Sequence, residues 1–366
     1  MRGLGITVTA IAAMVATACT PEAVSPAATT TSATATKMTN YLDGLVRARQ
    51  FRGAVEVRVG DKVLLSKGFD RADVDRDAPN GPDTRYRIAS LTKQFTALAV
   101  LILQEQGKLA VTDLVCAHLP NCPETWRAIT VEHLLTHTAG LFDYTEVTAA
   151  EVERNLAEFG PEPTPEQIIH TFIDRPLDFS PGTQWKYSSS GYTVLGQLIE
   201  QLSGHTYGQF MKDEIFDPLD MSDTAYQPDQ RDDDHDAVGY QNWTTPATTL
   251  ADATAFSSGG MYSTVTDLAR WNQFLLTGTP ALVKPDTLAQ LLRPRVDADA
   301  TGRYGYGLFT LGTGDAAIHF HGGWLAGFST YNEIRPATTL SIVVLSNLDT
   351  ADTMGVGRDL ATLANP

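Results

Sequence analysis

Ser90 and Lys93 are the residues of this sequence best placed to do chemistry. They belong to the tetrapeptide Ser-Leu-Thr-Lys, which follows an extended segment at 84–89 and precedes a segment at 94–106 with apolar residues at helical spacing. Side chains at i and i+3 lie on one face of a helix, and the N-terminal end of a helix favours developing negative charge. The pair therefore fits a nucleophilic serine with a lysine that helps to deprotonate it. For so short a motif, an ordinary capping serine beside a solvated lysine is the alternative.

Two further stretches carry polar residues in places suited to a cleft. Tyr187 and Ser189 lie on a loop between a Pro-Gly turn and an expected helix over 191–202. The stretch His321–Trp324, His-Gly-Gly-Trp, stands at the end of an expected apolar strand, where glycines let a ligand approach the strand edge closely. Taken alone, Tyr187 fits equally well an aromatic side chain packed between a turn and a helix, and His321 an ordinary strand-end histidine.

Three other features favour structural roles. His133 and His137 are spaced like metal ligands on a helix, but no glutamate stands in the position that zinc proteases use. The acidic run at 232–236 lacks the glycine and the final glutamate of a calcium loop, and we expect a solvated loop there. The run at 256–260 vaguely resembles serine-protease sequence without evident histidine and aspartate partners, so we expect a turn before a helix. We therefore expect neither a metal site nor a cofactor.

The elements that must position these residues are expected to form an α/β (α+β) fold. The N-terminal part predicts a helix at 36–49, a β-hairpin at 53–66 and a surface loop at 70–83. Short helices and irregular loops follow to about residue 252, and strands return at 304–311, 317–321, 329–334 and 340–345 before a closing helix at 352–363. Because turns separate these strands, we expect an antiparallel sheet built from both termini and flanked by helices, with a mostly helical inserted domain.

The expected domain boundaries follow from this pattern and from composition. Residues 37–110 and 253–366 are expected to form the α/β domain, and residues 111–252 the helical inserted domain. Residues 19–36 are rich in Ala, Thr, Ser and Pro, which cannot form a core, and are expected to be a tether. Residues 1–18 are expected to be a signal peptide.

The N-terminus predicts export. Met1-Arg2 precedes an apolar run at 6–18 that is shorter than the roughly 20 residues a bilayer-spanning helix needs. The run ends in Ala-Thr-Ala-Cys19, which fits either a signal-peptidase site or a bacterial lipobox that places a lipidated Cys19 at the mature N-terminus. We expect a lipoprotein of the cell envelope, with simple secretion as the alternative.

Cys116 and Cys122 are the two other cysteines and lie close together in the sequence. In an exported protein such a pair is expected to form a disulfide. The alternatives are two free thiols, or metal ligands together with His118, although that site would lack a convincing fourth ligand.

The composition is that of a folded, acidic protein. The 366 residues are 43% hydrophobic and carry a formal net charge of −16, which allows a large core and argues against a disordered chain. The acidic excess leaves no basic stripe for nucleic acid. The expected partners are therefore a small-molecule or peptide substrate and, only through a lipid anchor, the membrane. The sequence carries no signal for an oligomeric state.

Three stretches together resemble the serine β-lactamase and penicillin-binding-protein superfamily, in the branch that holds class C β-lactamases, D-alanyl-D-alanine carboxypeptidases, D-aminopeptidases and related esterases. The motifs occur in the family's order as Ser90-x-x-Lys93, Tyr187-x-Ser189 and His321-Gly-Gly323. Flanking stretches at 133–141, 259–271 and 322–329 also match, so the resemblance runs from about Tyr41 to the C-terminus. It implies a metal-independent hydrolase that forms an acyl-enzyme.

The resemblance implies a role for each motif residue. Ser90 is expected to be the acylated nucleophile, Lys93 its neighbouring cation, and Tyr187 the base, with its pKa lowered from about 10 by the nearby ammonium. The backbone amides of Ser90 and Trp324 are expected to form the oxyanion hole. The remaining motif residues are expected to line the substrate cleft: Ser189, His321 and Gly323.

Two departures from the family pattern bear on the substrate. The second motif usually ends in Asn, whose amide contacts both the substrate's acyl-amide carbonyl and the neighbouring lysine; the shorter Ser189 is expected to reach only Lys93. The third motif usually begins with Lys, and a largely neutral His321 attracts a substrate carboxylate less strongly. We therefore expect an exported hydrolase of esters or D-amino-acid peptides that favours esters, with a weak β-lactamase or a D,D-carboxypeptidase as the alternatives within this class. The rival hypothesis is an envelope protein that binds peptidoglycan-like peptides without turnover.

Overall fold

The computed structural model describes Met1 and residues 33–160, 163–226, 235–248, 254–299 and 302–364. The expected signal peptide, Cys19, most of the tether and most of the acidic run at 232–236 lie outside these residues. The end of the expected tether instead starts a helix, α1 (Ala33–Arg47), because Met38 and Leu42 bury one face of it in an apolar cluster with the sheet. None of the helices formed by these residues is long and apolar enough to cross a membrane.

An antiparallel sheet of eight strands forms the centre of the described body. Its order is β2-β1-β13-β12-β11-β10-β9-β8, so a strand from the N-terminal part pairs with the last strand of the chain. This confirms the predicted fold class of a sheet built from both termini. The strands are β1 (Gly53–Val59), β2 (Lys62–Phe69), β8 (Val296–Asp297), β9 (Arg303–Tyr304), β10 (Phe309–Leu311), β11 (Ile318–Leu325), β12 (Phe328–Arg335) and β13 (Leu340–Ser346).

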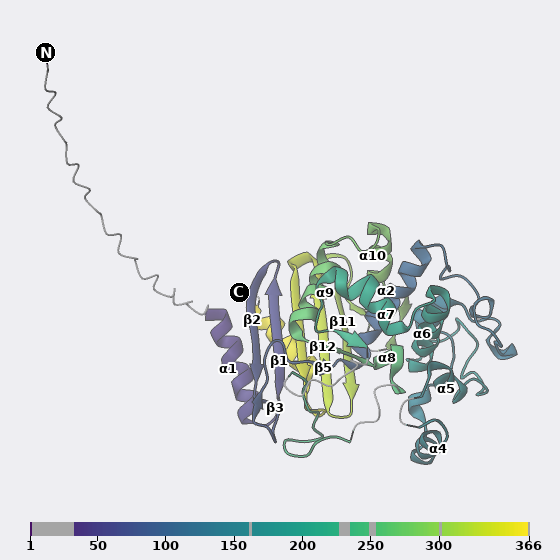
Figure 1. Cartoon of the computed structure of the whole chain (residues 1–366), viewed down its shortest axis with the longest axis horizontal. Helices are drawn as coiled ribbons and strands as arrows, with labels where there is room; N and C mark the ends of the chain where they lie inside the picture. Colours follow the sequence, from purple (N-terminus) through teal and green to yellow (C-terminus); the bar gives the residue numbers. More distant parts are fainter. Residues whose placement is uncertain (2–32, 161–162, 227–234, 249–253, 300–301, 365–366) are drawn as a thin grey trace. The chain divides into compact units, whose positions relative to one another are not determined.

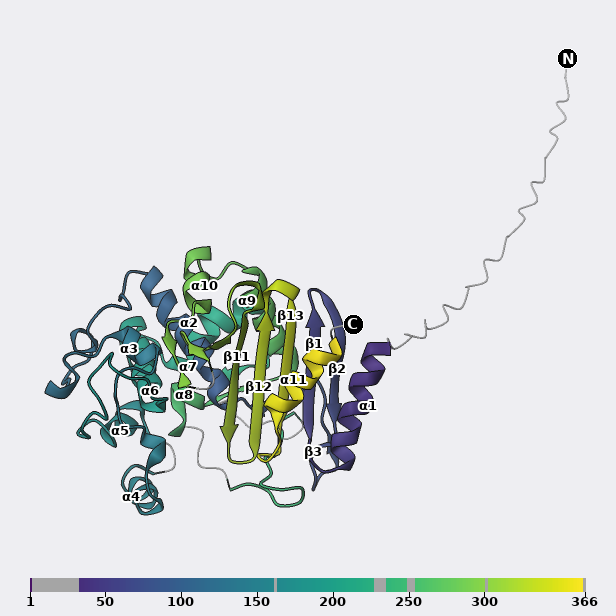
Figure 2. The ribbon, with the colours of Figure 1, turned by 180° about the vertical axis from the view of Figure 1, so that it is seen from behind.

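Helices cover both faces of this sheet (Figure 1). On one face α1 and α11 (Thr353–Ala364) pack over apolar residues of β1 and β13 (Figure 2). On the other face lies α9 (Val265–Thr277), in a cluster that also contains the apolar residues of α2 (Thr92–Glu105). Every residue of β13 is buried because the strand has helices on both sides, which explains why its sequence is apolar almost throughout.

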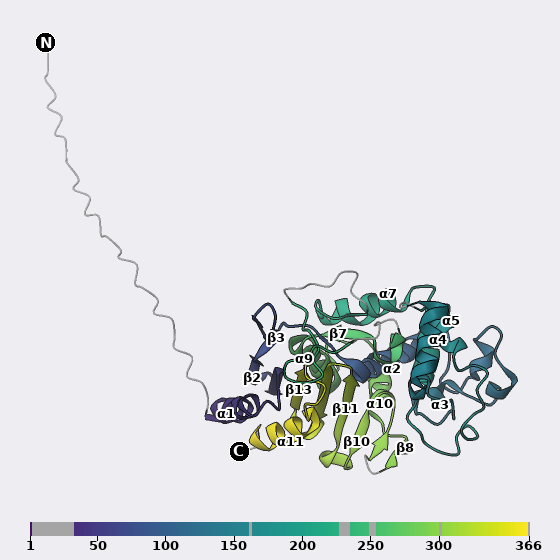
Figure 3. The ribbon, with the colours of Figure 1, turned by 90° about the horizontal axis from the view of Figure 1, so that it is seen from below.

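A group of helices beside the sheet carries the second motif (Figure 3). Its longest member, α6, is buried along most of its length because α2, α3, α5 and α8 pack around it. The boundaries of the expected inserted domain stay a prediction. The helices outside the two sheet faces are α3 (Val131–Leu135), α4 (Ala149–Phe159), α5 (Pro165–His170), α6 (Ser189–Ser203), α7 (Tyr207–Met211), α8 (Phe256–Gly259) and α10 (Pro285–Leu292).

Short strands connect these helices to the nucleophile segment. β5 (Tyr86–Arg87), β7 (Met261–Ser263) and β6 (Ala225–Tyr226) form a small sheet of their own in the order β5-β7-β6. The loop expected at 70–83 contains a further short pair, β3 (Arg71–Asp73) and β4 (Ala78–Pro79), so it is not wholly irregular.

Two predicted strands differ from the structure. The strand expected at 304–311 is divided into β9 and β10, because Gly307 turns the chain with a φ of +74° and brings it so close to α2 that a Cβ there would lie 2.6 Å from the Lys93 carbonyl oxygen. The stretch His321–Trp324 lies within β11 rather than at its end, because β12 pairs with this strand as far as Leu325.

Candidate active site

Ser90 lies in a tight 3-10 turn, Ala89–Leu91, directly before α2. Ala89 has a left-handed backbone with φ of +50°, a conformation that is costly for a residue with a side chain and is found most often at functional sites. The neighbouring Ile88 anchors the turn, because its amide donates to the Met261 carbonyl at 2.9 Å and its carbonyl accepts from the Thr330 hydroxyl at 3.0 Å. Strands β7 and β12 thus hold the turn in place.

Lys93 is completely buried and points at Ser90, as the i, i+3 spacing predicts. Its Nζ donates to Ser90 Oγ at 3.2 Å and to the Ser258 carbonyl at 2.8 Å. Burial lowers the pKa of this amine to about 7, and the negative charge of Asp143 opposes the shift. At neutral pH a large share of Lys93 is therefore uncharged and able to accept a proton.

Tyr187 also contacts the nucleophile. Its hydroxyl donates to Ser90 Oγ at 2.9 Å, and Lys93 Nζ lies 4.7 Å from the centre of its ring. Burial raises the pKa of the phenol above its usual range and outweighs the lowering by the hydrogen bond to Ser90, so the expected lowering of this pKa is wrong. Tyr187 is a neutral hydrogen-bond donor in this structure.

The ring of His137 packs against the ring of Tyr187. The two rings have their centres 4.4 Å apart, and His137 Nδ1 accepts a hydrogen bond from the Ser188 amide at 3.2 Å. His133 instead closes the N-terminus of α3, where Thr130 and His133 exchange backbone and side-chain hydrogen bonds. Both histidines therefore have the structural roles that the sequence favoured. Within the ranges that the structure describes, no group of three potential ligands could hold a metal ion.

Ser189 is the first residue of α6 and lines the cavity above Ser90. Its amide donates to Asp143 Oδ2 at 3.1 Å. In the described part of the chain the Lys93 amine bonds Ser90 and Ser258 rather than Ser189, so the expected contact between Ser189 and Lys93 is wrong. The Asp143 carboxylate holds the start of α6 through the Ser189 amide, while the Lys93 amine donates to the Ser258 carbonyl instead.

His321 is buried on the side of β11 that faces Lys93 and Tyr187. Its Nε2 lies 3.3 Å from the Tyr304 hydroxyl, and its ring centre is 6.1 Å from that of Tyr187. Burial, reinforced by the charge of Lys93, lowers the pKa of His321 to about 3. The imidazole is therefore neutral across the physiological range, as the sequence predicted.

Gly323 is the point where β11 touches the nucleophile turn. A Cβ at this position would lie 2.3 Å from Thr330 Oγ1 and 2.7 Å from the Ile88 carbonyl oxygen, so only glycine fits. Ala89 and Gly323 are thus neighbours. The residues that follow them, Ser90 and Trp324, both line the cavity. The oxyanion hole formed by their amides stays a prediction. The indole of Trp324 is 64% exposed and lines the cavity.

The sequence did not predict that the loop at Asp143-Tyr144 contacts the segment 254–258 next to Lys93. Tyr144, which follows Asp143, donates its hydroxyl proton to the Thr254 carbonyl at 2.7 Å and lies 3.2 Å from Ser258 Oγ. The run at 256–260, expected to be an unremarkable turn, forms α8 and supplies the Ser258 carbonyl that binds Lys93. The sequence signal that could have indicated these residues is their position two residues after the stretch at 133–141, which matches the family.

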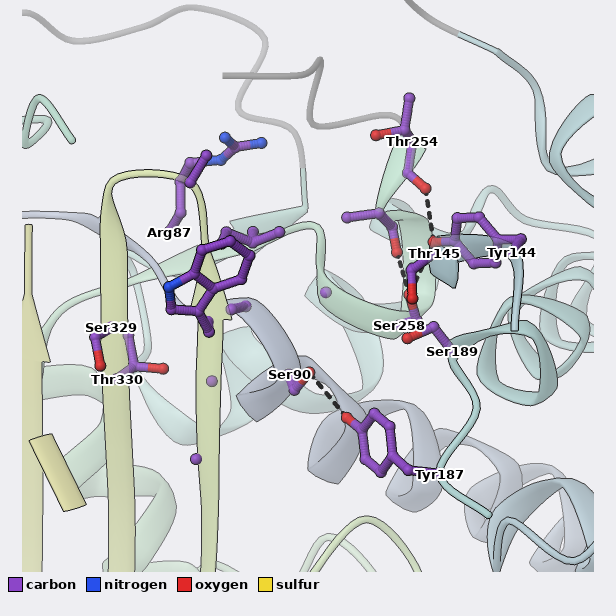
Figure 4. A pocket seen from close by; sticks show the side chains of 18 of the residues that line it. Arg87, Ser90, Tyr144, Thr145, Tyr187, Ser189, Thr254, Ser258, Ser329 and Thr330 are labelled. Atoms are coloured by element: carbon purple, nitrogen blue, oxygen red, sulfur yellow. Dashed lines mark hydrogen bonds between the residues drawn. The ribbon is translucent and has the colours of Figure 1, made fainter. Parts of the chain in front are cut away.

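A cavity of about 900 Å³ opens above Ser90 (Figure 4), and the residues named above that line it are Ser90, Tyr144, Tyr187, Ser189, Ser258, His321, Gly323 and Trp324. Tyr187 and Ser90 lie on its floor, Tyr144 and Ser258 on the side of the helices, and Ser329 and Thr330 on β12 at the opposite side (Figure 4). The serine on the floor of this cavity accepts hydrogen bonds from a neutral phenol and from a lysine that is partly uncharged at neutral pH. Such an arrangement can carry out acyl transfer.

The sequence matches the Beta-lactamase family model over residues 38–365. The chain therefore belongs to the beta-lactamase family, a class of serine hydrolases related to penicillin-binding proteins.

Among curated proteins, the protein flp of Staphylococcus aureus (strain MW2) is 29% identical over 303 residues, which are 79% of this chain and 58% of that protein. The chain thus spans less than two thirds of the length of such relatives. A penicillin-binding protein from Bacillus halodurans has the same fold, with a TM-score of 0.78 at 24% identity over 88% of this chain and 99% of that one. A D-stereospecific amidohydrolase from Streptomyces sp. has a TM-score of 0.72 at 25% identity over 88% of this chain and 97% of that one.

Proposed function

We propose that this protein hydrolyses esters and D-amino-acid amides or peptides through an acyl-enzyme on Ser90. One observation carries the proposal: Ser90 Oγ accepts hydrogen bonds from both Lys93 Nζ, at 3.2 Å, and Tyr187 Oη, at 2.9 Å, on the floor of a substrate-sized cavity. A protein that only binds peptides has no need of this arrangement. The complete cluster favours the enzyme over the binding protein.

Acylation starts from the uncharged form of Lys93. The amine takes the Ser90 hydroxyl proton while Oγ forms a bond to the acyl carbon, and the carbonyl π electrons move to the oxygen, where the amides of Ser90 and Trp324 stabilise the charge. The carbonyl then re-forms and the bond to the leaving group breaks. The leaving group receives the proton from the Lys93 ammonium, with the Tyr187 hydroxyl as the relay between them.

Deacylation uses the same groups in reverse. A water molecule attacks the acyl carbon and gives a proton to Lys93, and the second tetrahedral adduct breaks its bond to Ser90 Oγ. The Ser90 alkoxide regains the proton, and the carboxylic acid leaves.

Two features support the substrate class. His321 is buried and neutral, so it supplies no positive charge for a substrate carboxylate. Ser189 offers a hydroxyl where an amide would contact the acyl-amide group, which favours esters. The likeness to a D-stereospecific amidohydrolase adds D-amino-acid amides to the candidate substrates.

A covalent label tests the proposal. We expect a fluorophosphonate to modify the protein on Ser90, with the site located by peptide mass spectrometry, and the Ser90→Ala variant to resist labelling and to lose ester hydrolysis. Ser189→Ala, which removes a hydroxyl from the same cavity, is the matched control and is expected to remain labelled. A folded native protein that resists the label and hydrolyses no ester would favour the binding protein instead.

We also propose that the protein is exported and held at the cell envelope by a lipid on Cys19. The support is the apolar run at 6–18 and the residues before Cys19. Growth of an expressing bacterium with radiolabelled palmitate is expected to label the native protein and not Cys19→Ser. Native protein that is secreted without label would favour simple cleavage.

A further inference from the structure

The cavity extends from the catalytic cluster onto the other face of the sheet. Side chains alternate along β11, so His321 and Gly323 face Lys93 and the nucleophile turn, while Phe320, Gly322 and Trp324 face α11. Phe320 accordingly packs in the apolar cluster that contains Val356 and Leu360 of α11. Residues of both sets line the same cavity.

The open edge of β11 makes this continuity possible. The neighbouring strand β10 pairs with β11 from Ile318 to Phe320, and among the residues that the structure describes no strand pairs with this edge of β11 from His321 onward. A substrate bound at Ser90 can therefore reach around the edge to the face that carries α11.

The part of the cavity on that face is largely apolar, with Ser329 and Thr353, whose hydroxyls lie 2.9 Å apart, as its polar side chains, and we call it the α11 lobe. The rings of Phe309 and Phe320 stack with centres 5.5 Å apart, and the Met354 methyl lies 3.9 Å from where a Cβ of Gly322 would be. Trp324 and Met354 remain 64% and 38% exposed at the mouth of the cavity, where they adjoin the other apolar side chains of the lining. The lobe is lined by Phe309, Phe320, Gly322, Trp324, Ala351 and Met354.

The position of the proton donors indicates which part of a substrate enters the lobe. The leaving group must depart next to Tyr187 and Lys93, since these return the proton to it. Within the cavity lining, the ring centre of His321 lies 6.1 Å from that of Tyr187, and the ring centre of Phe309 lies 5.3 Å from that of His321. The lobe therefore begins on the side where the leaving group departs, whereas the apolar residues near Tyr144, such as Val147 and Phe159, line the other side of the cavity.

The charges around the lobe disfavour an anion. The neutral His321 stands at its entrance, and the carboxylate of Asp352 lies at its rim, where it caps α11 by accepting from the Gly355 amide at 2.8 Å. The basic residue of the cavity lining, Arg87, comes from β5 next to the nucleophile turn.

We propose that the α11 lobe binds the leaving group of the substrate and selects an uncharged, apolar alcohol or amine, with aromatic groups favoured. This inference rests on the proposed function and adds to it the class of group that is released.

The test compares leaving groups of different size on one acyl group. Phenyl acetate and 2-naphthyl acetate differ in the leaving group, and 4-nitrophenyl acetate and octanoate differ in the acyl chain. Position 322 has room for a Cβ, whose nearest neighbours would lie at 3.8 and 3.9 Å, so Gly322→Val places its methyl groups in the lobe, and Met354→Ala removes a side chain that lines it. Leu311→Ala is the control, because this exposed apolar residue of β10 is outside the cavity lining.

We expect the native protein to prefer the naphthyl ester, and both lobe variants to lower the naphthyl-to-phenyl ratio of kcat/KM by roughly 10 fold, the effect of one or two apolar groups in a pocket. The ratio of octanoate to acetate should not change, and Leu311→Ala should change neither ratio. The native protein should also discriminate against 4-acetoxybenzoate relative to its methyl ester.

Three results would overturn the inference. If the naphthyl-to-phenyl ratio is unchanged in both variants while Ser90 still carries turnover, the lobe does not bind the leaving group. If the variants alter the acyl-chain ratio instead, the lobe binds the acyl group. If no ester is turned over in a Ser90-dependent manner, the proposed function itself fails and the lobe assignment fails with it.

Discussion

At the scale of single residues, the protonation state of Lys93 decides when Ser90 can react. Burial lowers the pKa of Lys93 to about 7, and only the uncharged amine can take the serine proton. We therefore predict that kcat/KM for an ester falls about tenfold per pH unit below pH 7 and is level above it. A pH–rate profile measures this. A flat profile between about pH 5 and 9 would show that Lys93 is not the base.

A charge-preserving variant is the control for this prediction. An arginine remains protonated throughout the range, so Lys93→Arg should lose activity at every pH, and circular dichroism should show that it is folded. His321 does not complicate the profile, because its pKa of about 3 lies well below the range.

The substrate preference has a second residue-scale test at Ser189. An asparagine there restores the amide that contacts an acyl-amide group, a hydrogen bond with a net value of about 1 to 2 kcal/mol. We predict that Ser189→Asn raises the ratio of cephalosporin to nitrophenyl-ester turnover by roughly 5 to 30 fold. The measurement is kcat/KM for both substrates in both proteins. If the native protein already prefers the cephalosporin, Ser189 does not set the preference.

The sequence predicted the pairing of Ser90 and Lys93 because residues three apart on a helix share a face. It also placed Tyr187 near them, through the resemblance. It misjudged the pKa of Tyr187, since the direction depends on complete burial, and burial is a property of the folded neighbourhood rather than of the motif.

At the scale of elements, the loop after α3 joins the two sides of the catalytic cluster. Asp143 receives the Ser189 amide at the start of α6, while Tyr144 donates to the Thr254 carbonyl ahead of α8. The carboxylate of Asp143 is buried, and its charge raises the pKa of Lys93 against the effect of burial. We predict that Asp143→Asn moves the acid limb of the pH–rate profile to lower pH, because Lys93 loses its nearby negative charge.

The control removes a similar charge elsewhere. Asp178→Asn breaks an exposed ion pair with Lys186, at 2.8 Å, and should leave the profile in place. If Asp143→Asn lowers kcat/KM but leaves the acid limb of the pH–rate profile at the same pH, the role of Asp143 is structural and its charge does not set the pKa of Lys93.

The cysteine pair is a second element-scale prediction. Cys116 and Cys122 lie side by side with Cα atoms 5.2 Å apart, and we predict that they are joined in exported protein. Closing so short a loop stabilises a fold by roughly 2 kcal/mol, so the double variant Cys116→Ser, Cys122→Ser should lower the free energy of unfolding by about that amount. Peptide mapping that finds both native thiols free and alkylatable would contradict the prediction.

Alternating and continuous apolar patterns were enough to predict β12, β13 and the first half of β11, and their turns predicted an antiparallel sheet. The role of Asp143 and Tyr144 was not predictable in the same way. Their partners at Ser189 and Thr254 lie far along the chain, and hydrogen bonds between distant loops leave no periodic signal.

At the scale of the molecule, the site exists only because both chain ends enter one sheet. The nucleophile turn follows β5, and Gly323 meets it from β11. In the sheet that contains β11, the pairing of β1 with β13 joins the N-terminal strands to the C-terminal strands. Because the three motifs come together only in the folded chain, each motif alone was weak evidence for an active site. Their occurrence in the family's order was informative.

The central claim is that catalysis passes through a covalent acyl group on Ser90, and the most direct measurement is the mass of the protein quenched by acid during turnover of a slowly hydrolysed ester. We predict a gain in mass equal to the acyl group, located on the peptide that contains Ser90, and no gain in Ser90→Ala. Steady turnover with no adduct on Ser90, or with the acyl group on another residue, would contradict the account.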